Sequence, residues 1–242
     1  MSITLQLQSS VTTQTEPTDR ALDIAAMFGL SIDGTHEHVI LPPIGLTLAP
    51  GQVIFVTGVS GGGKSTLLHA ISDALDSEKT QKGDDAWPGV IWNDRLRALP
   101  DRPLVEALAR PECESDTVVP DADLSTVCRW LSLAGLNDAA VMLRRPGELS
   151  EGQRYRLRLA QSIASAERRP EAWSVLLADE LGSSLDRATA GALAQSIRRW
   201  VTRSNVCLVA ATAHDDLLEP LGPDVLVDVA PGGNCAVHYR PA

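Results

Sequence analysis

The sequence predicts an α/β fold with a parallel sheet at its centre. Continuous apolar runs occur at Val53–Thr57, Ser174–Ala178 and Val206–Ala211, and such runs are typical of parallel strands buried on both faces. Stretches compatible with helices follow two of these runs, from about 64 to 75 and from 187 to 202. Because strand and helix alternate in this way, each helix can cross the sheet and connect parallel strands.

The N-terminal part of the chain predicts a different kind of structure. Residues 1–20 are rich in Ser, Thr and Gln, so a flexible tail is expected there, or one edge strand from Ile3 to Leu7. From Ala21 to Leu48, short apolar stretches alternate with turn signals such as Asp33-Gly34 and Pro42-Pro43. This alternation is typical of strands joined by tight turns, and it predicts a small antiparallel β region beside the parallel sheet.

The middle of the chain predicts an insertion. Asp76–Gly89 is polar and contains glycine and proline, so it is expected to be a surface loop. Residues at about 95–150 read as mainly helical, with prolines marking the breaks. A helix from about 152 to 167 and short strands between 225 and 239 complete the expected elements. We therefore expect one domain over 21–242, with a helical subdomain inserted in it.

Composition limits the kind of protein. The chain has 242 residues, 44% of them hydrophobic, which is ordinary for a soluble globular protein. A net charge of −10 argues against a broad nucleic-acid-binding face, because phosphate contacts need clustered Lys and Arg. The sequence contains no apolar stretch long enough to act as a signal peptide or to span a bilayer. We therefore expect a cytoplasmic protein with no membrane span of its own.

A glycine-rich motif follows the first buried run and predicts a nucleotide site. The motif is Gly58-Val59-Ser60-Gly61-Gly62-Gly63-Lys64-Ser65-Thr66, which fits G-x-x-x-x-G-K-[ST] in full. Its glycines let backbone N–H groups turn toward phosphate oxygens, and the helix that follows presents its positive end. Lys64 is expected to reach the β- and γ-phosphates of ATP, and the Ser65 hydroxyl to bind Mg²⁺. The sheet is therefore predicted to be the core of a P-loop nucleoside triphosphatase.

Two adjacent carboxylates end the second buried run. The run Ser174–Ala178 leads directly into Asp179 and Glu180. Since parallel strands end at the same edge of a sheet, these carboxylates are expected to face the same crevice as the glycine-rich motif. Asp179 can hold Mg²⁺ through a water molecule, and Glu180 can polarise the water that attacks the γ-phosphate.

A third motif connects the chain with a known family. Leu149-Ser150-Glu151-Gly152-Gln153 resembles the L-S-G-G-Q signature of ATP-binding cassette (ABC) ATPases, with Glu151 in place of the first glycine. Leu181-Gly182-Ser183-Ser184-Leu185-Asp186 resembles the D-loop of that family, with Leu181 in place of the usual proline. His214 stands after the third buried run, where the family has its switch histidine. The motifs occur in the family's order, and the resemblance covers roughly residues 30 to 230.

The resemblance implies an ATPase that works as a pair. In the family, two chains enclose two Mg-ATP head to tail, and the signature loop of one chain contacts the γ-phosphate bound to the other. The residues expected to make this contact are Ser150, Gly152 and Gln153. His214 would contact the γ-phosphate and help Glu180 to hold the attacking water.

Two departures from the family affect the expected site. The family has a glutamine after the strand that precedes the helical subdomain, whereas this chain has Asn93 and Asp94 there. Either residue could take part of the glutamine's role. An aromatic residue usually stacks on adenine, and His36 is the best placed here by spacing, with His38 and Phe28 as alternatives.

The changed loop leaves the partner open. In transporters of the family, the glutamine loop and the helical subdomain bind a permease. The loss of the loop glutamine therefore favours a non-permease partner such as a protein or nucleic-acid complex. The Ser-Glu-Gly-Gln-Arg-Tyr-Arg form from Ser150 also resembles a smaller group of stand-alone cassette ATPases. The alternative is the ATP-binding subunit of a membrane transporter, peripheral to the inner membrane. A nucleotide sensor without hydrolysis is disfavoured because Lys64, Asp179, Glu180 and His214 are all present.

Overall fold

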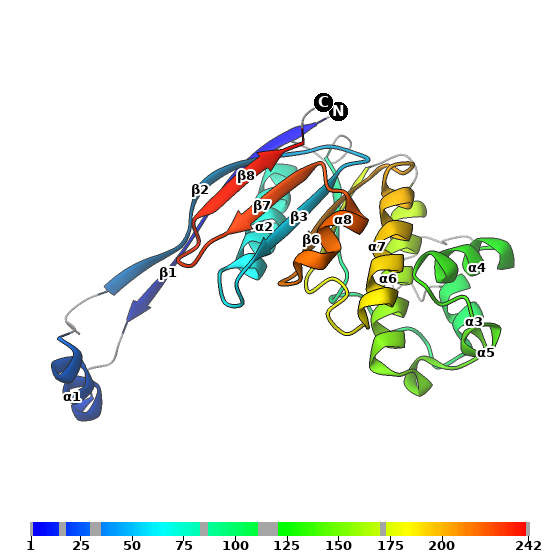
Figure 1. Ribbon diagram of the computed structural model, residues 1–242, viewed down its shortest axis with the longest axis horizontal. Coiled ribbons are helices and arrows are strands. Elements are labelled where there is room, and N and C mark those ends of the chain that lie inside the picture. Colours follow the sequence, from blue (N-terminus) through cyan, green and yellow to red (C-terminus); the bar gives the residue numbers. More distant parts are fainter. Residues whose placement is uncertain are drawn as a thin grey trace.

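A six-stranded sheet forms the centre of the protein (Figure 1). The computed structural model describes residues 2–14, 18–29, 35–82, 87–110, 121–169 and 173–240. Across the sheet the strands are β4 (Gly89–Trp92), β5 (Ser174–Ala178), β6 (Val206–Ala211), β3 (Val53–Gly58), β7 (Val225–Val229) and β8 (Cys235–Tyr239). All neighbours pair in parallel except β7 and β8. This confirms the predicted α/β fold with its parallel sheet.

Helices cover both faces of this sheet because its central strands are apolar on both faces. Every residue of β5 and β6 is buried. On one face, Phe55 of β3 packs in a core with the helices α6 (Glu151–Glu167) and α7 (Arg187–Val201). On the other face, Ile54 and Val56 pack with α2 (Lys64–Lys82). The carboxyl ends of β3 and β5 are thereby held at one edge, between the two layers of helices.

Of the two expectations for residues 1–20, a flexible tail or an edge strand from Ile3 to Leu7, the structure has the strand and extends it to Gln14. β1 (Ile3–Gln14) pairs antiparallel with β2 (Thr35–Leu48) in a two-stranded ribbon. Ile3, Leu5 and Leu7 are buried, because alternate side chains of a strand share one face and this face packs with α2. The ribbon is the predicted small antiparallel region, and it includes the segment from Ile3 to Leu7, for which an edge strand was the alternative to a tail.

A helix and a continuous strand replace the short strands expected from Ala21 to Leu48. α1 (Asp19–Phe28) is capped by Thr18, whose side chain accepts from the Ala21 N–H, and it ends at Gly29 in the left-handed conformation. Pro42-Pro43 lies inside β2 rather than at a turn, and Asp33-Gly34 lies outside the described residues. Figure 1 shows α1 beyond the end of the β1–β2 ribbon.

The surface loop expected at Asp76–Gly89 is in part helical. α2 continues to Lys82, because no glycine or proline interrupts it before Gly83 and its polar residues are good helix formers. The helical insertion is present as α3 (Leu104–Ala109), α4 (Leu124–Leu133), α5 (Ala139–Met142) and a short 3-10 helix (Pro146–Glu148). Residues 111–120, within the insertion, lie outside the described residues. The limits predicted for the whole domain stay a prediction.

None of the helices in the described ranges combines the length and the apolar content needed to span a bilayer.

The carboxylate of Glu167 joins the helical insertion to the core. It accepts hydrogen bonds from the Arg129 guanidinium and the Trp130 indole on α4, and from the Trp200 indole on α7. Burial alone would raise the pKa of Glu167, but these donors outweigh it and hold the pKa below its ordinary value of 4.5. A lowered carboxylate pKa contributes stability above the ordinary value, and this contribution is lost as the pH falls through the folded-state value.

We expect Glu167→Gln to lower the free energy of unfolding by about 2 to 4 kcal/mol. The amide offers a single acceptor oxygen to donors from Arg129, Trp130 and Trp200. Urea denaturation at pH 7 measures the effect, and Glu106→Gln on exposed α3 surface is the control. The difference between wild type and variant should shrink as the pH falls below about 4.5 and through the folded-state pKa, at which the folded wild-type carboxylate gains its proton. Equal urea midpoints at pH 7 would contradict this role.

Candidate functional site

The glycine-rich loop begins where β3 ends, and its first residue has to be glycine. Gly58 has a φ of 136°, in the region that favours glycine. A Cβ built on Gly58 would lie 2.1 Å from the carbonyl oxygen of Val229 in the neighbouring strand β7. The close approach of β7 thus fixes the point at which the backbone leaves the sheet.

Lys64 follows the loop as the first residue of α2. Its Nζ donates to the carbonyl oxygens of Gly58 and Val59, at 2.8 and 2.9 Å. The ammonium is therefore held over the loop, next to the N-terminus of α2. The first N–H groups of a helix have no partner within the helix, and the helix dipole adds positive charge there. The arrangement suits a bound phosphate.

The structure brings the loop and the two carboxylates together. A pocket of about 250 Å³ is lined by Ser60, Gly61, Gly63, Lys64, Ser65, Thr66, Asp179, Glu180 and Ala213. The loop supplies one side of this pocket and the end of β5 supplies another. As predicted from the parallel strands, Asp179 and Glu180 face the same crevice as Lys64. Gly58 itself lies at the start of the loop, outside the lining of this pocket.

The donor atoms in the pocket fit a magnesium ion bound with ATP. Mg²⁺ prefers oxygen ligands, and it is usually held by one or two protein groups together with waters and phosphate oxygens. Ser65 brings a hydroxyl and Asp179 a carboxylate to the same pocket. Within the described ranges, no group of three or more His, Cys, Asp or Glu side chains could hold a metal by itself. Phosphate oxygens and waters would supply the other ligands of a magnesium ion held by Ser65 and Asp179.

Glu180 lies in an unusual backbone conformation. It has a φ of 51°, and it is the one residue other than glycine with positive φ in the part of the chain that the structure describes. Its N–H donates to Oδ1 of Asp179 at 3.0 Å, and the next N–H, of Leu181, donates to the carbonyl of Ala211 in β6. Such a conformation costs of order 1 kcal/mol and persists only where surrounding contacts impose it.

His214 follows β6, as expected, but its side chain is engaged outside the pocket. Its Nδ1 lies 3.1 Å from Nη2 of Arg187, and Arg187 also pairs with Asp216. The neighbouring Ala213, rather than His214, lines the pocket around Lys64. The structure thus places His214 at the rim, and its predicted contact with the γ-phosphate stays a prediction.

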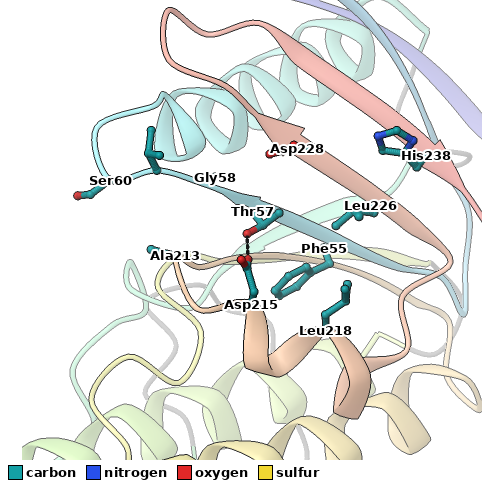
Figure 2. A pocket seen from close by; sticks show the side chains of 11 residues that line it. Phe55, Thr57, Gly58, Ser60, Ala213, Asp215, Leu218, Leu226, Asp228 and His238 are labelled. Carbon is teal, nitrogen blue, oxygen red and sulfur yellow. Dashed lines mark hydrogen bonds between the residues drawn. The ribbon is translucent and has the colours of Figure 1, made fainter.

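Asp215 is a site residue that the sequence reasoning missed. Its carboxylate accepts a hydrogen bond from the hydroxyl of Thr57, the residue before the glycine-rich loop (Figure 2). The bond joins the segment after β6 to the end of β3, beside a second pocket that Ser60, Asp228 and His238 also line. The signal was present in the sequence, since Asp215 directly follows His214.

The signature residues form the start of α6, away from this pocket. The Ser150 side chain accepts from the Gln153 N–H, and the Gln153 side chain accepts from the Ser150 N–H, which makes a capping box. None of the described residues that line the pocket around Lys64 comes from this motif. One chain alone therefore does not bring Ser150, Gly152 and Gln153 to its own phosphate site.

Asn93 stands where the family has its glutamine, and it is turned into the protein. Its side chain is 2% exposed, and its Oδ1 accepts a hydrogen bond from Ser162 of α6 at 3.3 Å. Asp94 is exposed and lies outside the pocket around Lys64. The structure thus brings neither residue to the metal site.

The residues considered for adenine lie in the N-terminal part of the chain, two in β2 and one in α1. His36 and His38 are in β2, whose Ile40 carbonyl lies near Gly63 of the loop, but their side chains lie outside the described residues. Phe28 ends α1 and is 71% exposed. The stacking role of His36 stays a prediction.

Comparisons with known proteins identify relatives of this chain. The family model described as ABC transporter matches residues 41–181. The aliphatic sulfonates import ATP-binding protein SsuB of Delftia acidovorans is 34% identical over 183 residues, which cover 74% of this chain and 69% of that protein. The lipoprotein-releasing system ATP-binding protein LolD of Acinetobacter baylyi is 28% identical over 211 residues, or 80% of this chain and 88% of that protein.

A solved structure supports the fold alone, because its sequence identity is low. It is a dimeric ATP-binding cassette in a post-hydrolysis state, bound to ADP and Pi, with a TM-score of 0.66 at 15% identity. The match covers 99% of this chain and 100% of that chain. The family match and the sulfonate-import relative show that the chain belongs to the ABC transporter family, as an ATP-binding cassette that binds ATP with Mg²⁺ and hydrolyses it.

Proposed function

We propose that this chain is the ATP-binding subunit of a membrane transporter and that it works as a head-to-tail pair enclosing two ATP molecules. The position of the signature loop carries the proposal. Ser150 begins α6 outside the pocket around Lys64, so a second copy has to supply the signature loop that faces this pocket. In a closed two-fold pair, each copy places its signature loop on the phosphate pocket of the other, through the same contact. The relative solved with ADP and Pi is itself dimeric.

Different residues of the pocket bind different parts of the nucleotide. The loop from Ser60 to Gly63 and the first N–H groups of α2 receive the phosphate oxygens, with Lys64 as the positive charge beside them. Ser65 and Asp179 would hold Mg²⁺, and the metal would supply positive charge to the phosphate oxygens. Thr66 extends the first turn of α2 along the same wall of the pocket.

Glu180 acts as the general base. It lines the phosphate pocket at the end of β5, and its carboxylate can accept the proton of the attacking water as the water adds to the γ-phosphorus. The bond from the γ-phosphorus to the bridging oxygen breaks, and ADP leaves with that oxygen. His214 orients this water from the rim, while the signature loop of the partner copy contributes Ser150 and the N-terminal dipole of its α6.

The names of the relatives favour a membrane partner. One relative is an import ATP-binding protein and the other belongs to a lipoprotein-releasing system. The non-permease partner that the changed loop favoured receives no support from these comparisons. The chain would then work at the cytoplasmic face of the inner membrane, bound to a separate membrane-spanning subunit.

Ser150→Arg tests the pairing. We expect ATP hydrolysis to fall about 100-fold, because the arginine occupies the place of the γ-phosphate contact and keeps the copies apart. Binding of ATP to the single chain should stay within about twofold, since Ser150 lies outside its own pocket. The control is Ser132→Arg, which adds the same side chain at an exposed position in α4. Undiminished hydrolysis in Ser150→Arg would refute the head-to-tail pair.

Affinity purification tests the partner. The chain carrying Glu180→Gln is purified with ATP from detergent-solubilised membranes of its own cells, and co-purifying proteins are identified by mass spectrometry. Recovery of a multi-span membrane protein in about equal amount supports the transporter. Recovery of a soluble protein or nucleic acid in its place would contradict it and return the function to the non-permease class. The wild-type chain with ADP serves as the control.

A further inference from the structure

The signature helix α6 packs directly against the turn that follows Glu180. A Cβ built on Gly152 would lie 3.2 Å from Cδ2 of Leu185 and 3.3 Å from the carbonyl oxygen of Ser184. The first turn of α6 therefore has no space between itself and the segment after β5. Any displacement of the signature loop acts on this segment, because packed protein interiors do not deform freely.

Tyr155, one turn further along α6, adds a buried hydrogen bond to the same contact. The side chain is 6% exposed, and its hydroxyl oxygen accepts from the N–H of Gly182 at 3.2 Å. Burial raises the pKa of Tyr155 to about 12, although the hydrogen bond from Gly182 opposes the increase. The phenol is therefore protonated at every physiological pH, and the bond does not change with pH.

Gly182, which has no side chain, links Tyr155 to the general base Glu180, two residues earlier in the chain. It has a φ of 73°, and a Cβ there would lie 3.2 Å from Cβ of Ala190 and 3.3 Å from Cδ1 of Leu217. Its backbone is thus enclosed by α7 and by the segment after β6. Because these contacts leave the turn little room to move, the position of the Gly182 N–H determines where the Glu180 carboxylate lies in the phosphate pocket.

We propose that Tyr155 is a positioning residue that couples the two nucleotide sites of the pair. The proposal rests on the head-to-tail pairing argued above. Ser150 at the start of α6 contacts the ATP held by the partner copy, and Tyr155 on the same helix holds the turn that carries Glu180, which acts on the ATP of its own chain. ATP at one site thereby sets the placement of the base at the other.

Rigidity makes α6 suitable for this role. Ser150 and Tyr155 are separated by five positions of one continuous helix, which is a rise of about 7.5 Å. A shift of the capped N-terminus is therefore passed on to Tyr155 without loss. Without the hydroxyl, the buried N–H of Gly182 would have no acceptor from α6, and the turn would be held by packing alone.

Tyr155→Phe tests the coupling, because it removes the acceptor and keeps the ring. We expect kcat for ATP to fall about 10-fold while KM stays within about twofold, since the loss concerns the placement of the base and not binding. The Hill coefficient for ATP should fall from about 2 to about 1, which a loss of general stability would not produce. The control is Tyr239→Phe, which removes a hydroxyl from the exposed second tyrosine of the chain.

Leu185→Ala keeps the proposal testable if Tyr155→Phe does not fold. Leu185 is half-buried, and its loss loosens the packing on Gly152 without removing a buried polar group. We expect a smaller decrease in kcat and in the Hill coefficient. Wild-type kcat and Hill coefficient in both variants, or no cooperativity in the wild type, would overturn the coupling.

The pairing is measured separately, by gel filtration of Glu180→Gln with ATP. A dimer in this experiment, together with unchanged kinetics in Tyr155→Phe, refutes the coupling and leaves the proposed function intact. The absence of a dimer refutes the proposed function and the coupling with it. A dimer and a loss of cooperativity support both.

Discussion

Glu180→Gln is expected to lower the rate of ATP hydrolysis about 1000-fold, within the range that a positioned general base contributes. The amide keeps the shape and the hydrogen-bonding reach of the side chain, but it does not accept the proton of the attacking water. ATP should therefore bind as in the wild type, because Lys64 and the loop are unchanged. The product is a pair of chains that holds ATP without turning it over.

Single-turnover hydrolysis and gel filtration with ATP measure the two halves of this result. The control is Glu219→Gln, an exposed glutamate in the short helix α8 (Leu218–Leu221). The positive φ of Glu180 makes the choice of residue important, since a β-branched replacement would add backbone strain to the loss of the carboxylate. Hydrolysis at the wild-type rate in Glu180→Gln would show that another group is the base.

Lys64→Ala is expected to weaken ATP binding about 100-fold, because hydrogen bonds to charged groups are worth about 1.5 to 3 kcal/mol each. The ammonium lies over the loop and is the positive side chain that lines the pocket. Its loss leaves the phosphates with backbone N–H groups and the dipole of α2 alone. A fluorescent ATP analogue measures the affinity by titration.

Lys79→Ala is the matched control for this variant. Lys79 is exposed on the same helix, about four turns from Lys64 and hence roughly 22 Å away. The Lys79→Ala variant leaves the phosphate pocket unchanged and controls for the loss of one positive charge. Equal affinities in Lys64→Ala and in the wild type would show that the loop binds phosphate without its lysine.

The sequence was sufficient for the core of the fold and for predicting that the glycine-rich loop and the two carboxylates share one pocket. The bounds of β5 and β6 match the predicted runs, because strands buried on both faces leave an unbroken apolar signal. The prediction that Lys64 and Asp179 face one crevice followed from the parallel order of their strands, and the pocket confirms it.

Local signals failed where tertiary contacts decide the structure. The polar composition of residues 1–20 left a tail and an edge strand from Ile3 to Leu7 both open, and Ile3 and Leu5 are buried because β1 packs with β2 and α2. The direction of a side chain is likewise set by its neighbours. Asn93 turns toward Ser162, and His214 toward Arg187, and neither partner is adjacent in the sequence. The bond between Tyr155 and Gly182 is of the same kind.

The strand order has a consequence for how this protein is made. β3, which carries the phosphate loop, lies between β6 and β7, and Val53 pairs with Leu208. During synthesis, β3, which leads into Gly58, therefore has neither of its neighbouring strands to pair with until most of the chain has left the ribosome. Pairing over such separations is slow, and it leaves apolar strands exposed to aggregation. The strand that leads into the phosphate loop therefore gains both of its neighbouring strands only after β6 and β7 have been made.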